Sequence, residues 1–217
     1  MALAIFDLDN TLIAGDSDHT WGDFLVSLGV VDSATFKATN DRFYQDYLRG
    51  ELDILAYVRY VVEPLSRYPW EQLQAWRQQF MEEKIRPLML TKADELLQKH
   101  RSQGDYLLII TATNRFVTQP IAELLGVDQL IATELEFKDG RYTGEIDGVP
   151  SYQQGKVVRL NTWLKDHPFD LDEAYFYSDS HNDIPLLDCV GHPIVIDGDE
   201  QLLTYAAEKQ WPTMSLR

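Results

Sequence analysis

The sequence has little cysteine, few basic residues and no long hydrophobic run. Cys189 is the single cysteine among 217 residues, so no disulfide can form within the chain, and a reducing compartment suits it. We expect this side chain to be buried. No apolar stretch approaches the roughly 18 residues of a membrane span, and Asp7 comes too early for a secretory signal peptide. We therefore expect a cytoplasmic protein with no membrane partner.

The balance of charge restricts the partners further. The chain has 35 acidic and 19 basic side chains, which gives a formal net charge of −16. Such an excess of negative charge repels nucleic acid and anionic membrane surfaces. We expect a small-molecule partner. A small molecule that is cationic or bound to a metal is favoured. The sequence leaves a monomer and a homodimer both open.

Three short apolar runs each end at a polar cluster. These runs are 3–6 (LAIF) before Asp7, 106–110 (YLLII) before Thr111, and 174–177 (AYFY) before Ser178. Runs of this length fit strands that are buried on both faces of a parallel sheet. Helical patterns occupy 118–127 and 155–167, between the second and third runs. This alternation predicts an α/β fold with a doubly wound parallel sheet, in which ligands bind at the carboxyl ends of the strands.

Residues 16–87 interrupt the alternation. Their apolar residues recur at three- and four-residue spacing, which indicates helices and no strand. We predict a core domain of residues 1–15 and 88–217 and an inserted, all-helical cap domain of residues 16–87. Three tryptophans are expected in the interior of the cap, namely Trp21, Trp70 and Trp76.

A further segment, 133–146, alternates apolar and polar residues around Asp139 and Gly140. An Asp-Gly pair between two alternating runs is a strong signal for a β-hairpin. We therefore predict two antiparallel strands here, outside the parallel sheet.

Polar residues follow the three predicted strands and should meet at one edge of the sheet. They are Asp7 and Asp9 after the first, Thr111 after the second, and Asp179, Asn182 and Asp183 after the third, with Lys156 at the start of a helix. Carboxylates around one point suit a hard cation such as Mg²⁺, and a lysine with a threonine hydroxyl complements phosphoryl oxygens. A carboxylate can also act as nucleophile or move a proton. The set indicates phosphoryl transfer.

These residues resemble the four motifs of the haloacid dehalogenase superfamily. DLDNT at 7–11 resembles the D-x-D-x-T signature, IITAT at 109–113 the second motif, Lys156 the third, and SDSHND at 178–183 the fourth. The resemblance implies a Rossmann-like core. A helical insertion between the first two motifs is similar to that of the phosphoserine phosphatase branch.

The resemblance also implies roles for the motif residues. Asp7 would attack phosphorus and form an aspartyl-phosphate, while Asp9 would protonate the leaving alcohol and then activate water. Thr111 and Lys156 would hold the phosphoryl oxygens. The enzyme would then be a phosphomonoester hydrolase.

The implied cofactor is Mg²⁺. Its ligands would be Asp7, the backbone carbonyl of Asp9, and Asp179, with Asp183 in support. The five histidines show no metal-ligand spacing. We expect His100 to be exposed near a helix end.

The substrate is predicted by two positions in the insertion. In the phosphoserine phosphatase branch an acidic residue nine positions after the nucleophile meets the substrate amine, and that position is Asp16 here. The arginine that binds the substrate carboxylate in that branch aligns with Val61, while Arg59 falls two positions short. An amine partner without a carboxylate partner favours an amino-alcohol phosphate. The side chains expected to line the pocket are Thr113, Asn114 and Asn182.

Histidinol phosphate fits this description, and some bacterial members of the branch are histidinol-phosphatases of histidine biosynthesis. Phosphoserine and other small phosphate esters stay open as alternatives. So do a phosphotransferase and a non-catalytic module that binds phosphate or metal.

Overall fold

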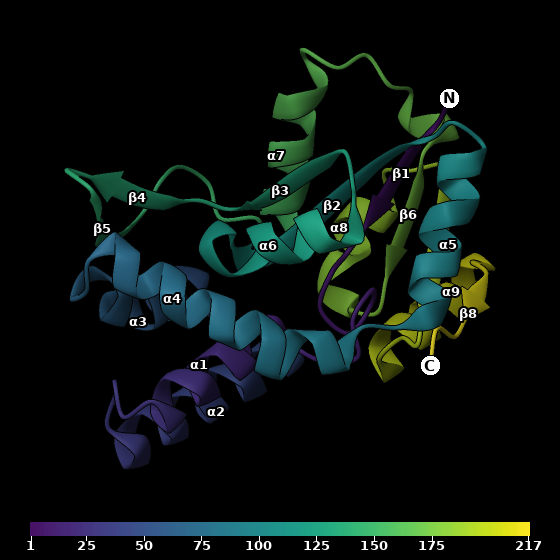
Figure 1. Ribbon diagram of the computed structural model, residues 1–217. Helices are drawn as coiled ribbons and strands as arrows, with labels where there is room; N and C mark the ends of the chain where they lie inside the picture. The colour runs from purple at the N-terminus through teal and green to yellow at the C-terminus, as the bar shows by residue number, and fades with distance from the viewer.

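The computed structural model describes all residues, 1–217, and contains a six-stranded sheet in which every ladder is parallel (Figure 1). Its order is β3-β2-β1-β6-β7-β8. The strands are β1 (Leu3–Phe6), β2 (Tyr106–Asn114), β3 (Gln129–Thr133), β6 (Tyr175–Ser178), β7 (His192–Ile196) and β8 (Thr213–Met214). The predicted parallel α/β fold is confirmed.

Helices cover both faces of this sheet because successive residues of a buried strand point to opposite sides. On β1, Ala4 and Phe6 pack into one buried cluster, with α5 (Thr91–Ser102) and α6 (Arg115–Leu125). Leu3 and Ile5 pack into a second cluster on the other face. The helices of that face are α7 (Gln154–Leu164), α8 (Ile184–Leu187) and α9 (Glu200–Lys209).

Four helices lie between β1 and α5, and Figure 1 shows them at one end of the molecule. They are α1 (Ser17–Ser27), α2 (Ser33–Leu48), α3 (Ile54–Ser66) and α4 (Trp70–Phe80), followed by a π-helical turn, Met81–Ile85, and a 3₁₀ turn, Arg86–Leu88. The segment contains no strand, as its periodicity predicts. Its two ends lie side by side, since Ala14 N donates to Leu88 O at 2.8 Å and Ile13 forms a bridge with Met89.

The inserted helices share a continuous hydrophobic cluster with the sheet. Trp21 of α1 is fully buried. Its ring centroid lies 5.0 Å from that of Phe80 and 5.5 Å from that of Phe116 on α6. Trp70 and Trp76 are partly buried. The division into a core domain and a cap domain at residues 16 and 87 stays a prediction.

The predicted hairpin is confirmed. It consists of β4 (Leu135–Lys138) and β5 (Arg141–Ile146), which pair antiparallel. Asp139 and Gly140 both have positive φ, 50° and 78°, as a tight two-residue turn requires. The hairpin reaches the inserted helices, where Arg59 Nε of α3 lies 3.0 Å from Glu145 Oε2.

Two sequence-based predictions were wrong. His100 is 1% exposed, because Asp105 and the Tyr177 hydroxyl hydrogen-bond its two ring nitrogens at 2.9 and 2.8 Å and satisfy them away from water. Cys189 is exposed. It follows the end of α8, where Leu187 and Val190 are buried while Asp188 and Cys189 between them face solvent.

Candidate active site

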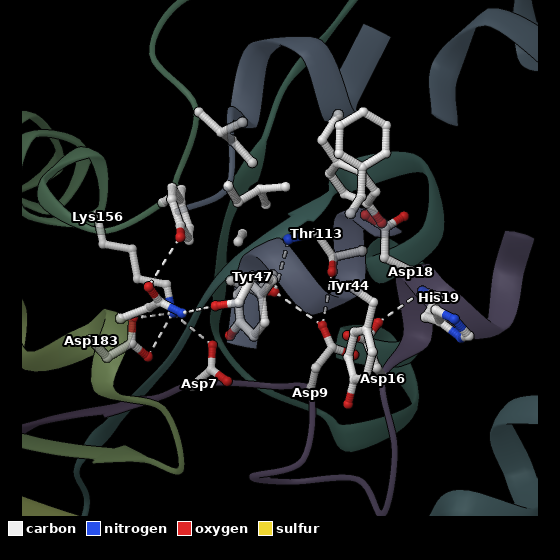
Figure 2. A pocket seen from close by; sticks show the side chains of 18 of the residues that line it. Asp7, Asp9, Asp16, Asp18, His19, Tyr44, Tyr47, Thr113, Lys156 and Asp183 are labelled. Carbon is white, nitrogen blue, oxygen red and sulfur yellow. Dashed lines mark hydrogen bonds and ion pairs between the residues drawn. The ribbon is translucent and has the colours of Figure 1, made fainter. Parts of the chain in front are cut away.

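The predicted site residues converge at the carboxyl ends of the central strands, because β1, β2 and β6 are parallel neighbours. Asp7 follows β1, Thr111 lies near the end of β2, and Asp179 follows β6. Lys156 reaches the same point from the first turn of α7. Figure 2 shows Asp7, Lys156 and Asp183 together at one end of a pocket.

Lys156 connects two carboxylates. Its Nζ lies 2.7 Å from Asp7 Oδ1 and 2.7 Å from Asp183 Oδ1, and Ser178 Oγ donates to Asp183 Oδ2 at 2.7 Å. Burial lowers the pKa of Lys156, but the charges of Asp183 and Asp7 outweigh that effect and raise it. The lysine therefore stays charged and fixes the positions of both acids.

Asp7 and Asp179 carry more negative charge than Lys156 compensates. Burial raises the pKa of Asp7 to about 7 against the opposing charge of Lys156, and the charge of Asp183 adds to the increase. Burial, followed by the charge of Asp7, raises the pKa of Asp179 well above its usual value. Thr11 Oγ1 donates to Asp179 Oδ1 at 2.9 Å. This anionic centre would be stabilised by a cation.

The donor set fits Mg²⁺. No group of three or more His, Cys, Asp or Glu side chains stands ready to enclose a metal ion. Mg²⁺ in phosphoryl-transfer sites takes one or two carboxylates and completes its shell with water and substrate phosphate. Two neighbouring carboxylates, Asp7 and Asp179, together with a backbone carbonyl at Asp9, meet that requirement.

The side chain of Asp9 is held away from Lys156. Its Oδ1 accepts from Ser17 N at 2.6 Å, and its Oδ2 accepts from Thr113 Oγ1 at 2.8 Å and from Thr111 Oγ1 at 3.5 Å. Burial raises the pKa of Asp9 to about 6, and the charge of Asp16 adds to this effect. A carboxyl group with such a pKa can give and take a proton near neutral pH.

A pocket extends from Lys156 to the inserted helices. Its polar lining residues are Asp7, Asp9, Asp16, Asp18, His19, Asn40, Thr111, Thr113, Lys156, Asn182 and Asp183. Its apolar and aromatic lining residues are Phe43, Tyr44, Tyr47, Leu52, Ile54, Tyr57, Ala112 and Tyr152. The lining includes one lysine and no arginine.

Asp16 lines this pocket at the N-terminus of α1, where its Oδ1 accepts from His19 N at 2.8 Å. Burial raises the pKa of Asp16. Asn182 Oδ1 accepts from the Tyr152 hydroxyl at 3.0 Å, and its Nδ2 donates to Tyr47 O at 3.0 Å, so it links α2 to the sheet edge. Asn114, which we predicted in the lining, is absent from it, because its side chain turns to the N-terminus of α6 and accepts there from Val117 N.

Sequence reasoning missed the far end of the pocket, which contains Asp18 and Asn40 besides several aromatic side chains. Burial, with the charge of Asp16 next, raises the pKa of Asp18 to about 8. The available signal was the second Asp-x-Asp pair, Asp16 and Asp18, which repeats the spacing of Asp7 and Asp9. Asn40 lies within an ordinary amphipathic helix and gave no such signal.

Residues 4–188 match a family described as haloacid dehalogenase-like hydrolase. The chain belongs to this family. The helices that the family resemblance associates with a cap are those that close the pocket over Asp7 and Lys156.

Similar proteins include phosphatases of this family. A histidinol-phosphatase of Neisseria meningitidis is 44% identical over 99% of each chain. A phosphoserine phosphatase of Mycobacterium tuberculosis is 29% identical over the whole chain and 71% of its own length. This haloacid dehalogenase-like hydrolase is therefore a phosphatase.

Solved structures show the same fold. A Bordetella pertussis protein of unknown function superposes with a TM-score of 0.93, at 42% identity over all of this chain and 99% of the other. A substrate-bound phosphoserine phosphatase has a TM-score of 0.72, at 19% identity over 98% of this chain and 92% of the other.

Proposed function

We propose that this phosphatase is a Mg²⁺-dependent histidinol-phosphatase that works through an aspartyl-phosphate on Asp7. The observation that carries the choice of substrate is the composition of the pocket. Asp16 and Asp18 line it, whereas Lys156 is its single lysine and no arginine is present. Such a pocket favours a phosphate ester that bears nitrogen groups and no carboxylate.

In the proposed first step a carboxylate oxygen of Asp7 attacks phosphorus, and the bond between phosphorus and the substrate oxygen breaks. Asp9 in its protonated form gives its proton to the leaving alkoxide, which departs as the alcohol. Lys156, held 2.7 Å from Asp7 Oδ1, keeps the nucleophile in place and offers its remaining N–H to a phosphoryl oxygen.

In the second step Asp9, now ionised, takes a proton from water as the water oxygen attacks phosphorus. The bond between phosphorus and Asp7 breaks, which releases inorganic phosphate and restores the enzyme. The pKa of Asp9, about 6, supports both the acid and the base role. Thr111, which lies 3.5 Å from Asp9 Oδ2, would hold a phosphoryl oxygen.

Mg²⁺ would be held by Asp7, Asp179 and the carbonyl of Asp9, and it would supply electrostatic stabilisation of the phosphoryl group. Both carboxylate oxygens of Asp183 already have partners. Lys156 Nζ contacts both of them, and Ser178 Oγ donates a hydrogen bond to Oδ2. A supporting role for Asp183, through Lys156 or a water molecule, therefore fits better than direct ligation.

Phosphoserine is the second candidate, since phosphatases of phosphoserine are among the relatives. Its carboxylate would need a cation at the far end of the pocket. Val61 is buried in the hydrophobic cluster, and Arg59 is 59% exposed and paired with Glu145. Neither residue lines the pocket.

The remaining proposals concern the surroundings of the enzyme. None of the helices combines the length and the apolar composition of a membrane span. An exposed free thiol at Cys189 suits a reducing compartment, which supports a cytoplasmic enzyme. A small phosphate ester is the proposed partner, and both a monomer and a homodimer accommodate the pocket.

The test is phosphate release from histidinol phosphate, phosphoserine, phosphoethanolamine and several sugar phosphates, each with Mg²⁺ and with a chelator. We expect kcat/KM to be highest for histidinol phosphate and to disappear with the chelator. A preference for phosphoserine would keep the chemistry and overturn the substrate. Transfer of phosphate to an added alcohol in place of water would indicate a phosphotransferase, and no release from any ester would indicate a binding module.

A further inference from the structure

The far end of the pocket contains two buried acceptors to which the proposed function assigns no particular group of the substrate. Asp18 lies on the first turn of α1 and is 6% exposed, and Asn40 lies on α2 and is 1% exposed. Both line the same pocket as Lys156. Figure 2 shows Asp18 at the end opposite Lys156, with Asp9 and Asp16 between them.

Asn40 has an unused hydrogen-bond acceptor. Its Nδ2 donates to His19 O at 3.4 Å, whereas its Oδ1 is buried without any partner. A buried carbonyl oxygen without a donor destabilises the folded chain, and such groups are rare in proteins unless a ligand or water satisfies them. The position therefore calls for an N–H or O–H group from a molecule in the pocket.

Asp18 has no cationic partner among the lining residues, because Lys156 is committed to Asp7 and Asp183 at the other end and the His19 ring pairs with Asp41 at 3.1 Å. The hydrogen-bond partners of Asp18 are neutral, namely Asn114 Nδ2 at 3.3 Å and the Tyr57 hydroxyl, so they hold the carboxyl group in position without bringing a positive charge to it. A buried carboxylate of this kind is stabilised by a ligand that donates N–H groups, most strongly by a charged one.

Aromatic side chains surround these acceptors. Phe43 and Tyr44 come from α2 and Tyr57 from α3, and all three line the pocket. Flat apolar walls with acceptors between them suit a flat ring that carries N–H groups. An aliphatic amine alone would leave most of this surface uncovered.

We propose that Asp18 and Asn40 bind the imidazole ring of the substrate through its ring N–H groups and so determine specificity. This inference rests on the proposed function, in which Lys156 holds the phosphate end, and on the sequence-based expectation that Asp16 meets the amine. The two residues would contact the ring of the substrate, which is remote from the phosphorus atom that reacts. Their loss should therefore weaken ring recognition more than the chemistry.

The test compares Asp18→Asn and Asn40→Ala with the wild type on two substrates. Histidinol phosphate has the ring and the amine, and phosphoethanolamine has the amine alone. We expect the ratio of kcat/KM for these substrates to fall at least about tenfold in each variant, mainly through KM for histidinol phosphate. The affinity for the product histidinol, measured by calorimetry, should decrease in the same variants.

Asp23→Asn is the matched control, because it removes the same charge from α1 at a side chain that is 46% exposed and outside the pocket. It should leave the ratio unchanged. Thermal melting of every variant separates loss of folding from loss of recognition, and Asn40→Ala tests the inference should Asp18→Asn fail to fold.

The outcomes distinguish this inference from the proposed function. If the wild type prefers another ester, the proposed function fails and this inference fails with it. If the wild type prefers histidinol phosphate but the folded variants keep its selectivity, or lose both substrates equally, the ring-binding assignment alone is overturned.

Discussion

The two ends of the pocket are built from different parts of the chain. At the phosphate end, Asp7, Lys156 and Asp183 come from the edge of the sheet, and ion pairs of 2.7 Å hold them together. At the far end, Asp18 and Asn40 come from α1 and α2, and Asn40 Oδ1 has no partner at all. At the first end a lysine of the protein pairs with two of the carboxylates, whereas at the second end a buried acceptor has no donor within the protein. This contrast separates chemistry from recognition.

The largest effect is expected at the phosphate end, from Asp7→Asn. An amide of the same shape cannot attack phosphorus, so kcat should fall at least about 10⁴-fold. The melting temperature should change little or rise, because burial already disfavours the charged form of Asp7. Phosphate release and circular dichroism measure the two quantities. Turnover above about 1% of the wild type would contradict the nucleophilic role.

Lys156→Met should have the next largest effect and should combine loss of activity with loss of stability. The substitution leaves Asp7 and Asp183 buried without their cation, which costs on the order of 3 kcal/mol. We expect kcat/KM to fall about 10³-fold as well. Urea unfolding and phosphate release are the measurements. Lys165→Met, at an exposed position just after α7, is the control, and an equal loss there would contradict this account.

A smaller effect is expected at the far end, in the pH dependence of stability. The pKa of Asp18 is raised to about 8 from 3.8, so the folded protein binds this proton more tightly than the unfolded chain. That contribution to stability is present below about pH 4 and is lost as the pH rises through about 8. The Asp18→Asn variant does not lose this contribution to stability as the pH rises, although Asp9 and Asp16 nearby still titrate.

The melting temperature of Asp18→Asn, relative to the wild type, should therefore increase by about 5 °C between about pH 5 and pH 9. Differential scanning fluorimetry without substrate measures the shift. A difference that stays constant or decreases over this interval would show that Asp18 is ionised in the folded protein at every pH tested.

Arg59→Ala should have the smallest effect, because Arg59 lies outside both ends of the pocket. Its ion pair with Glu145 is exposed on both sides, so its loss should cost less than about 1 kcal/mol. We expect KM for histidinol phosphate and for phosphoserine to change by less than about twofold. A selective increase of KM for phosphoserine would return Arg59 to the pocket and favour the second candidate substrate.

The same contrast explains what the sequence could predict. Asp7, Lys156 and Asp183 stand at strand ends or the start of a helix, where alternation of strands and helices brings distant positions to one edge. The parallel sheet, the helical insertion and the hairpin at Asp139 and Gly140 depend on local patterns of the same kind. These features were predictable because short-range order determines them.

The far end could not be predicted in this way. Asn40 reaches the pocket only because α2 packs against α1 at a particular rotation, and helical periodicity does not distinguish a polar residue aimed at a pocket from one aimed at water. His100 shows the same limit, because its partner Tyr177 lies on β6, far from it in the sequence. Specificity of this kind depends on how whole elements are oriented.

The pairing of Ala14 with Leu88 and of Ile13 with Met89 has a consequence for how such enzymes diverge. A segment that leaves and rejoins the sheet at adjacent points imposes no spacing on the strands it separates. Helices there could be lengthened, shortened or exchanged during evolution without shifting the alignment of β1 with β2. New substrates would then become accessible to one conserved phosphate chemistry through changes confined to a single loop of chain.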